Sequence, residues 1–215
     1  MDPPTEVAAQ RLAALQGLAP EVFMFDVEAG EMSMAYVEGQ RLEADWMWRP
    51  TRVELLQQVI KQLRRISAAE LPALDLPARL VQLHERLGSV DAERARPWSL
   101  RVQQCVRAWQ ATSGVGAAAV EVLVHGDLGV QNILLRADGT PSLLDWEYAH
   151  RGHPDEDLAG LEAQLAPDAA RVLQLASWSV EPRTFGLRVE LRRLLDGLWY
   201  DLARVIDPRD PATSA

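Results

Sequence analysis

Residues 120–147 read VEVLVHGDLGVQNILLRADGTPSLLDWE, and the predicted fold is organised around them. Its first five residues are almost continuously apolar, which predicts a buried strand. Two further short apolar runs, 133–135 and 142–144, flank the turn sequence 137–140 with its Asp-Gly core. Apolar runs on either side of such a turn predict a β-hairpin. The stretch is therefore expected to form a strand, a polar loop and a hairpin, in that order.

Three polar residues of this stretch are expected to meet. Asp127 opens the loop after the strand, Asn132 ends the loop, and Asp145 follows the second hairpin strand. Because a hairpin reverses the chain, Asp145 returns toward Asn132 and Asp127. A carboxylate and an amide oxygen side by side suit Mg²⁺, with phosphate oxygens completing its coordination. A second carboxylate, free of the metal, can accept a hydroxyl proton, so the three residues supply the parts that phosphoryl transfer requires.

The remaining sequence predicts one more hairpin and several helices. Two β-like runs at 21–26 and 31–37 are joined by an Ala-Gly turn signal and predict the hairpin. Helices are predicted over residues 5–16, 51–66, 79–87, 98–112, 154–164, 167–178 and 189–206. The predicted fold class is α+β, with a small β-containing piece at residues 1–38 followed by a mostly helical piece at residues 39–215.

The charge and the apolar runs of the sequence indicate which partners and which cellular location to expect. The chain has 215 residues and a net charge of −9. An acidic surface repels phosphate backbones, so no nucleic-acid partner is expected. No apolar run approaches the ~18 residues that a membrane span needs, and the first residues do not resemble a signal peptide, so we expect no membrane insertion and a cytoplasmic location. Cys105, the only cysteine, lies on the apolar face of a predicted helix and is expected in the core.

The loop sequence resembles the catalytic loop of small-molecule phosphotransferases with a protein kinase-like fold. His125, Asp127 and Asn132 match the pattern H-x-D, four residues, N of aminoglycoside phosphotransferases, choline and ethanolamine kinases, and thiamine kinases. The run LLDWEYA at 143–149 looks most like the choline and thiamine kinase branch. The resemblance covers residues 5–206 in order. It implies a two-lobed fold in which residues 1–38 are a truncated remnant of the N-lobe and residues 39–215 are a mostly helical C-lobe.

The resemblance implies a role for each polar residue of the loop and hairpin. Asp127 would be the catalytic base, and Asn132 would act beside it in the catalytic loop. Asn132 and Asp145 would hold Mg²⁺ against the phosphates of ATP. His125 would brace the loop rather than react, and Asp157 would anchor the loop backbone.

The resemblance also places the nucleotide and the acceptor. The hinge between the lobes, here Ala35, Tyr36 and Val37, would pair with adenine. Glu147 and Tyr148 would lie near the acceptor, a small molecule with a hydroxyl group such as choline, thiamine or an aminoglycoside. Such acceptors can be cationic, and carboxylates and aromatic faces hold cations. The aromatic residues considered for such faces are Trp146, Trp178, Trp199 and Tyr200.

Two parts of the family pattern have no counterpart in this sequence. Relatives carry a glycine-rich loop and a phosphate-binding lysine ahead of the first helix, whereas here no lysine precedes Glu6, the glutamate that would pair with it. Lys61, the only lysine, lies after the hinge. Three explanations are open: a truncated gene product, an enzyme in which an arginine such as Arg11 replaces the lysine, or a pseudokinase-type binding or regulatory protein that transfers no phosphate.

A metal-dependent hydrolase is the alternative from a different class of enzyme. His150 and His153 lie close in sequence to Asp155 and Asp157, and together they mimic a cluster of metal ligands. Such a hydrolase would use them with residues 125 and 127. Two observations weigh against it: Gly152 and Pro154 indicate a turn at this place, and the kinase-like interpretation explains more residues.

Overall fold

The computed structural model describes residues 3–42, 50–112, 121–164 and 177–206. Its helices are α1 (Pro3–Ala14), α2 (Pro50–Leu63), α3 (Leu76–Val90), α4 (Ala92–Ala111), α5 (Glu156–Gln164) and α7 (Pro182–Ile206), and η2 (Val130–Asn132) is a 3₁₀ turn. Its strands are β1 (Val22–Asp26), β2 (Glu31–Met34), β3 (Gln40–Arg41), β4 (Val122–Val124), β5 (Ile133–Leu135), β6 (Pro141–Leu143) and β7 (His150–Gly152). Helices combined with small antiparallel sheets confirm the predicted α+β class.

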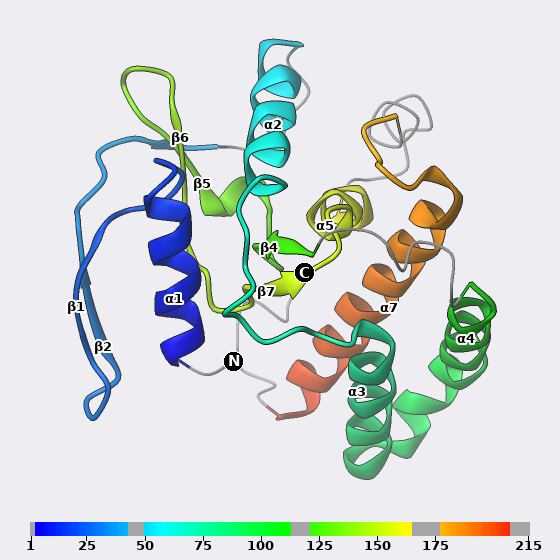
Figure 1. The fold of residues 1–215 in the computed structure, drawn as a ribbon. Coiled ribbons are helices and arrows are strands. Elements are labelled where there is room, and N and C mark those ends of the chain that lie inside the picture. The colour runs from blue at the N-terminus through cyan, green and yellow to red at the C-terminus, as the bar shows by residue number, and fades with distance from the viewer. Residues whose placement is uncertain (1–2, 43–49, 113–120, 165–176, 207–215) are drawn as a thin grey trace.

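The first hairpin, β1–β2, stands beside α1 at one edge of the molecule (Figure 1). Its register pairs Asp26 with Glu31, and Gly30 takes a positive φ of 67° in the turn. The Asp26 carboxylate closes the turn by accepting the backbone N–H groups of Glu28 and Ala29. The hairpin is confirmed, although its second strand ends at Met34 rather than at residue 37.

The second hairpin, β5–β6, forms where the Asp-Gly turn predicted it. Ile133 pairs with Leu143, and Gly139 takes the positive φ of 82° in the turn. The two-residue strand β3 adds to this hairpin through β5 and was not predicted. Gly39 precedes β3 and lies so close to the Leu135 carbonyl that a Cβ there would be only 2.7 Å from its oxygen.

The buried strand after residue 120 forms as β4 and pairs with β7 (Figure 1). Val122, Leu123 and Val124 are all buried, which explains the continuous apolar run. Its partner β7 was not predicted, because its sequence, His150-Arg151-Gly152, has neither apolar alternation nor β-branched residues. The pairing of Val124 with His150 sets the end of β4, where the polar loop begins.

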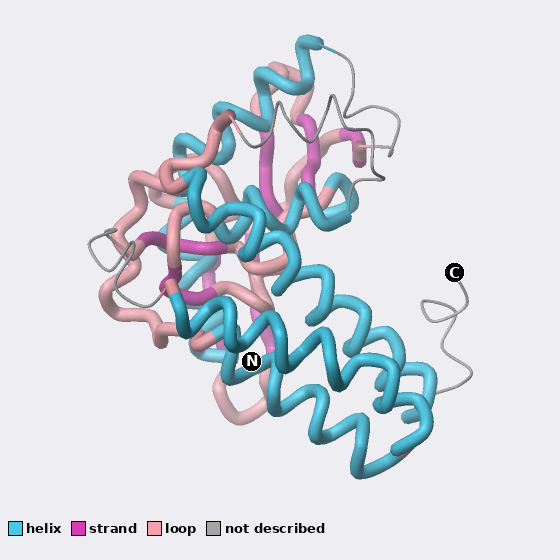
Figure 2. The backbone as a smooth tube through the Cα atoms, turned by 90° about the vertical axis from the view of Figure 1, so that its right-hand side faces the viewer, coloured by secondary structure: helices cyan, strands magenta, loops and turns pink. Residues whose placement is uncertain are grey.

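Helices α3, α4 and α7 run side by side and form a second, purely helical layer (Figure 2). Asp91 separates α3 from α4: its N–H bonds the Leu87 carbonyl, and its side chain caps α4 at Arg94. The apolar face predicted for the last helix is confirmed, since Leu191, Leu194 and Leu198 are at most 1% exposed. This helix starts at Pro182, seven residues earlier than predicted, because proline suits the first turn of a helix.

Two clusters of buried apolar residues hold these layers together. The larger one joins α1, α2, β4, the β5–β6 hairpin, α5 and the start of α7, and the smaller one joins α3, α4 and α7. Cys105 is buried in the smaller cluster, as predicted, and burial raises the pKa of its thiol to about 11. Ala9, Ala13 and Leu18 share the larger core with residues beyond position 39, so the division at residues 38 and 39 stays a prediction.

Some predictions lie outside the described residues. They include most of the helix predicted at 167–178 and the C-terminal residues from 207 onward. Within the described ranges, no helix combines the length and the apolar character that crossing a membrane requires.

Candidate active site

The polar loop, residues 125–132, begins at the buried end of β4 and is anchored there by Asp157 of α5. The two carboxylate oxygens of Asp157 accept the N–H groups of His125 and Gly126, at 2.9 and 3.0 Å. Asp157 is buried, and this burial raises the pKa of its carboxyl to about 6, although the two backbone hydrogen bonds oppose the shift. The anchoring contact predicted for Asp157 is therefore present.

His125 joins the polar loop to the chain just before Asp145. Its Nδ1 accepts the N–H of Asp127 at 3.3 Å, which leaves the ring proton on Nε2, and Nε2 donates to the Leu144 carbonyl at 3.0 Å. The ring is fully buried and lies 4.6 Å from the ring of Trp146. Burial lowers the pKa of His125 to about 4, so the ring stays neutral. These contacts fit the bracing role that was predicted.

Gly126 is the position in the loop where only glycine fits. Its φ is 81°, and a Cβ would collide with the backbone carbonyl of Tyr148. The close approach lets the loop pass directly over the segment that follows Asp145. Sequence reasoning assigned no role to this glycine, because neither its φ nor its distant neighbour is visible in the sequence.

Asp127 and Asn132 are in direct contact. The Asn132 side-chain amide donates from Nδ2 to the Asp127 carboxylate at 3.0 Å and to its backbone carbonyl at 2.9 Å. Because both bonds use the amide nitrogen, the amide oxygen points away from Asp127. Burial raises the pKa of the Asp127 carboxyl, and the charge of Arg192 and the Asn132 hydrogen bond oppose the shift.

Asp145 lies near Asp127 and Asn132, as expected from the β5–β6 hairpin that precedes it. The Leu144 N–H donates to the Asn132 carbonyl at 2.9 Å, and the Asp145 charge is close enough to raise the pKa of Asp127. Asp145 has a φ of 64°, the one positive φ outside glycine among the described residues. An L-residue in this conformation is strained by about 1–2 kcal/mol. Strain at a carboxylate that neighbours two other polar groups points to a functional constraint.

The group fits a hard divalent cation by the chemistry of its donors. Asp145 supplies an exposed carboxylate, and Asn132 supplies an amide oxygen directed away from the Asp127 carboxylate. Carboxylate and amide oxygens are ligands that Mg²⁺ accepts, and it retains further positions for water or phosphate oxygens. These two residues would hold the ion, and Asp127 would remain free for proton transfer.

Glu147 and Tyr148 lie exposed beside the same group, and Glu6 approaches from α1. Burial raises the pKa of Glu6, and the charges of Asp145 and Glu147 raise it further. Tyr148 also has a raised pKa, because it is partly buried and lies against the charge of Glu147, to which it is hydrogen-bonded. The carboxylates of Glu6, Asp145 and Glu147 therefore lie close to one another, and their shared negative charge favours cations there.

The aromatic residues separate into core and surface. Trp146 is fully buried, and its Nε1 donates to the Leu143 carbonyl at 3.2 Å, so of the two roles considered for it, ligand face or core, the structure shows core. Trp178 is partly buried and packs against the larger core. Trp199 and Tyr200 are 41% and 47% exposed, and their rings meet edge to face at 5.2 Å. These two remain available for an acceptor.

The predicted hinge lies between β2 and β3. The Ala35 N–H donates to the Glu21 carbonyl at 2.8 Å, so this donor is already used within the hairpin. Tyr36 is 91% exposed and Val37 is partly buried. A base that pairs with this segment would therefore use the N–H of residue 36 or 37, or a carbonyl of the segment. Pairing with adenine at these residues stays a prediction.

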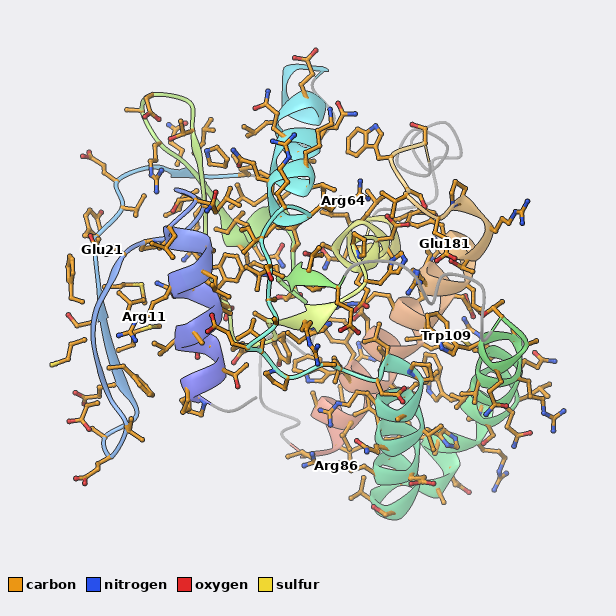
Figure 3. The ribbon with its side chains drawn as sticks, viewed as in Figure 1. Arg11, Glu21, Arg64, Arg86, Trp109 and Glu181 are labelled. Carbon is orange, nitrogen blue, oxygen red and sulfur yellow. The ribbon has the colours of Figure 1, made fainter. Side chains whose placement is uncertain are left out.

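The structure locates Arg11, the arginine considered as a replacement for the lysine. Arg11 lies about 140° around α1 from Glu6, because successive helical residues are ~100° apart. Figure 3 shows Arg11 on the side of α1 that faces the β1–β2 hairpin. Lys61 is exposed in α2. Arg11 thus points away from the carboxylate that it would have to approach.

The residues of the metal-hydrolase alternative are engaged elsewhere. The His150 ring is hydrogen-bonded through Nδ1 to the Tyr148 carbonyl at 2.9 Å and through Nε2 to the Glu156 carboxylate at 2.8 Å. Asp155 accepts three donors from residues 179–181. Arg64, the residue that follows α2 (labelled in Figure 3), also contacts Asp155, at 2.7 Å. Among the described residues, no group of three or more His, Cys, Asp or Glu could hold a metal ion. Nothing in the site therefore favours a hydrolase.

Arg192 of α7 is a residue of the site that sequence reasoning missed. Its guanidinium donates to the Gly126 carbonyl and lies 3.4 Å from the Asp127 carboxylate. The helical pattern places Arg192 beside the apolar face of α7, but it does not indicate a partner 65 residues away.

Comparison with solved structures shows which fold the chain has. A choline/ethanolamine kinase family protein from Mesorhizobium loti superposes with a TM-score of 0.72 and 19% identity, over 98% of this chain and 74% of that one. The choline kinase LicA from Streptococcus pneumoniae gives 0.74 and 16%, over 95% and 73% of the two chains. An aminoglycoside 2″-phosphotransferase in complex with GDP and kanamycin gives 0.69 and 21%, over 100% and 80%. The predicted kinase-like fold is confirmed.

The sequence itself assigns the family. A profile of the phosphotransferase enzyme family matches residues 4–184, and the chain therefore belongs to this family. No protein of curated function matches the sequence.

Proposed function

We propose that this protein is an ATP- and Mg²⁺-dependent phosphotransferase that phosphorylates a hydroxyl group of a small, cationic molecule. The observation that carries the proposal is the contact of Asp127 with Asn132 beside the strained Asp145, on a loop anchored by Asp157. Family membership supports phosphoryl transfer as the reaction class.

Asp127 is the proposed catalytic base. Its partly exposed carboxylate has a raised pKa, which makes it a stronger proton acceptor than an ordinary aspartate. It would take the proton of the acceptor hydroxyl as the hydroxyl oxygen bonds to the γ-phosphorus. The bond between that phosphorus and the β–γ bridging oxygen breaks, and ADP leaves. Most of the rate enhancement in such a reaction comes from positioning and electrostatic stabilisation.

Asn132 and Asp145 are the proposed Mg²⁺ ligands. The bound ion would neutralise charge that develops on the phosphate oxygens. The role of this chain is to hold the two oxygen donors at fixed positions: η2 and the Leu144 N–H fix the Asn132 backbone, and the β5–β6 hairpin fixes Asp145. The strain at Asp145 is consistent with a carboxylate whose position matters more than its contribution to stability.

The nucleotide is proposed to bind along the hinge at Ala35–Val37, with its phosphates toward Asp145. Support comes from two relatives of the same fold: LicA has been solved with AMP, and the aminoglycoside 2″-phosphotransferase with GDP.

The acceptor is proposed to be cationic, for example choline, ethanolamine, thiamine or an aminoglycoside. Glu6 and Glu147 add negative charge near Asp145, and Asp196 adds negative charge near Asp127. The exposed rings of Trp199 and Tyr200 lie on the same helix as Asp196. Aromatic faces attract alkylammonium groups by ~0.5–2 kcal/mol. The proteins of similar fold include a choline kinase, an ethanolamine kinase and an aminoglycoside 2″-phosphotransferase solved with kanamycin.

The test is ADP production from MgATP with a panel of amino alcohols, quaternary ammonium alcohols, thiamine and aminoglycosides, with the phosphorylated product identified by mass spectrometry. We expect product with one cationic class, and loss of turnover by ~10³-fold or more in Asp127→Asn. Asp138→Asn, in the exposed turn of the β5–β6 hairpin, is the matched control and should retain full turnover. Undiminished turnover in Asp127→Asn would refute the assigned base.

A further inference from the structure

Arg192 spans from α7 to the polar loop and makes polar contacts at three places. Its Nη1 donates to the backbone carbonyl of Gly126. Its Nη2 lies 3.4 Å from Oδ1 of Asp127, and its Nε donates to Asp196 at 2.8 Å. The guanidinium therefore contacts both the main chain and the side chain of the loop. A planar guanidinium can make such contacts together because its donors point in fixed directions.

The Asp127 carboxylate is held from two sides by different donors. Oδ2 accepts the Asn132 amide at 3.0 Å, and Oδ1 faces Arg192. With one donor on each oxygen, the plane of the carboxylate is fixed relative to the loop. Each oxygen retains a second lone pair, so the carboxylate can still accept a proton.

The surroundings of Arg192 restrict its guanidinium to this position. Asp196 lies one helical turn further along α7 and accepts its Nε, so the side chain is held against its own helix. On the other side is Gly160 of α5, which lies next to the guanidinium: a Cβ there would stand 4.0 Å from the guanidinium carbon, in ordinary van der Waals contact. The Arg192 side chain is only 22% exposed. A partly buried cation between two carboxylates is screened less by water than a surface ion pair.

We propose that Arg192 is a positioning residue for the transfer reaction: it holds the Gly126 backbone and the Asp127 carboxylate in the geometry that receives the acceptor proton. This inference rests on the proposed function, with Asp127 as base. Because α7 also carries Asp196, Trp199 and Tyr200, the same helix would orient both the base and the acceptor. Arg192 itself touches neither the acceptor nor the phosphate in this assignment.

The kinetic test compares Arg192→Ala with Arg193→Ala. Arg193 is its exposed neighbour on the same helix, so the two substitutions remove the same charge from adjacent positions. We expect Arg192→Ala to lower kcat by ~10²-fold with the acceptor KM within about threefold of the wild type, and Arg193→Ala to change neither by more than about twofold. Added guanidinium ion should raise the kcat of Arg192→Ala by at least ~tenfold. The kcat of Arg192→Lys should be higher than that of Arg192→Ala. Unchanged kcat in Arg192→Ala, or a loss that guanidinium does not restore, would overturn the proposal.

A second measurement does not depend on turnover. Hydrogen exchange of the backbone amides at residues 125–132 should become faster in Arg192→Ala and stay at wild-type rates in Arg193→Ala. Equal exchange in the two variants would overturn the holding role. If the wild type transfers no phosphate but its loop exchanges faster without Arg192, the proposed function fails while the contact with the loop stands.

Discussion

The polar loop and the β1–β2 hairpin use the same two devices with different consequences. In each segment, one aspartate carboxylate accepts hydrogen bonds from the backbone N–H groups of two consecutive residues, and one glycine takes a positive φ. Asp157 is buried and accepts the N–H groups of residues 31 and 32 positions earlier in the chain. Asp26 is exposed and accepts the N–H groups of residues two and three positions later. Gly126 at φ 81° lies against another segment, whereas Gly30 at φ 67° has no heavy atom within 4 Å of where a Cβ would lie.

Burial and sequence separation decide how much such a hydrogen-bonded turn contributes to stability. A hydrogen bond exposed to water exchanges with solvent and contributes little, whereas a buried acceptor leaves its partners unsatisfied when it is removed. The hairpin is also sparsely covered, since Phe23, Met24 and Val27 are 60–70% exposed. The loop should therefore be sensitive to single substitutions, and the hairpin tolerant of them.

The largest expected effect comes from adding one methyl group to each glycine. Gly126→Ala should lower the free energy of unfolding by about 3 kcal/mol or more, because the strain of a positive φ adds to a collision with the Tyr148 backbone. Gly30→Ala adds only the conformational strain and should cost ~1 kcal/mol. Urea denaturation of both variants measures the difference. Equal costs would show that the close approach at residue 126 relaxes freely.

The next effect is a pH dependence specific to the loop. His125 has a folded-state pKa lowered to about 4 by burial, so its contribution to stability is complete above its unfolded pKa of ~6.5 and is lost as the pH falls toward 4. The wild type loses ~3 kcal/mol from this group over that range, and His125→Gln does not. The destabilisation caused by His125→Gln should therefore shrink by up to ~3 kcal/mol between pH 7 and pH 4. A constant difference across this range would contradict the buried, neutral ring.

The two aspartates provide the third comparison. Asp157→Asn replaces one acceptor oxygen by an NH₂ group that faces a backbone N–H, and should cost ~2 kcal/mol together with a loss of turnover of tenfold or more. In the hairpin both N–H groups bond the same oxygen of Asp26, which an asparagine retains, so Asp26→Asn should cost less than ~0.5 kcal/mol. Thermal denaturation and the ADP assay give both quantities. Similar costs for the two variants would remove the distinction between buried and exposed acceptors.

The smallest expected effect has the opposite sign. Asp145 has a φ of 64°, nearly the φ of Gly30 in the hairpin turn, where glycine adopts it without strain. Asp145→Gly should raise the free energy of unfolding by up to ~1 kcal/mol while turnover falls ~10²-fold, because the strain is relieved and a metal ligand is lost. A variant that is both less stable and fully active would show that Asp145 is there for the fold and not for the reaction.

Much of the site was predictable because it depends on local signals. The apolar run before Asp127 predicts a buried strand, and the Asp-Gly turn returns Asp145 to Asn132. The spacing of Asp127, Asn132 and Asp145 also carries the family resemblance, and through it the anchoring contact of Asp157.

The rest depends on contacts between distant segments. Strand β7 has a polar sequence and forms because β4 needs a partner. Trp146 lies between two acidic residues, and only the fold shows that its ring is buried against His125. Arg192 is one of several arginines on α7, and only the packing of this helix against α5 and the loop selects it.

In the proposed function, Asp127, Asn132 and Asp145 form the metal-dependent half of a phosphotransferase site. Isothermal titration of ADP with and without Mg²⁺ tests it directly in the wild type, in Asp145→Asn and in the exposed control Asp138→Asn. Mg²⁺ should strengthen ADP binding to the wild type and the control by ~tenfold or more, and this gain should vanish in Asp145→Asn while metal-free binding stays unchanged. An equal gain from Mg²⁺ in all three proteins would contradict the account.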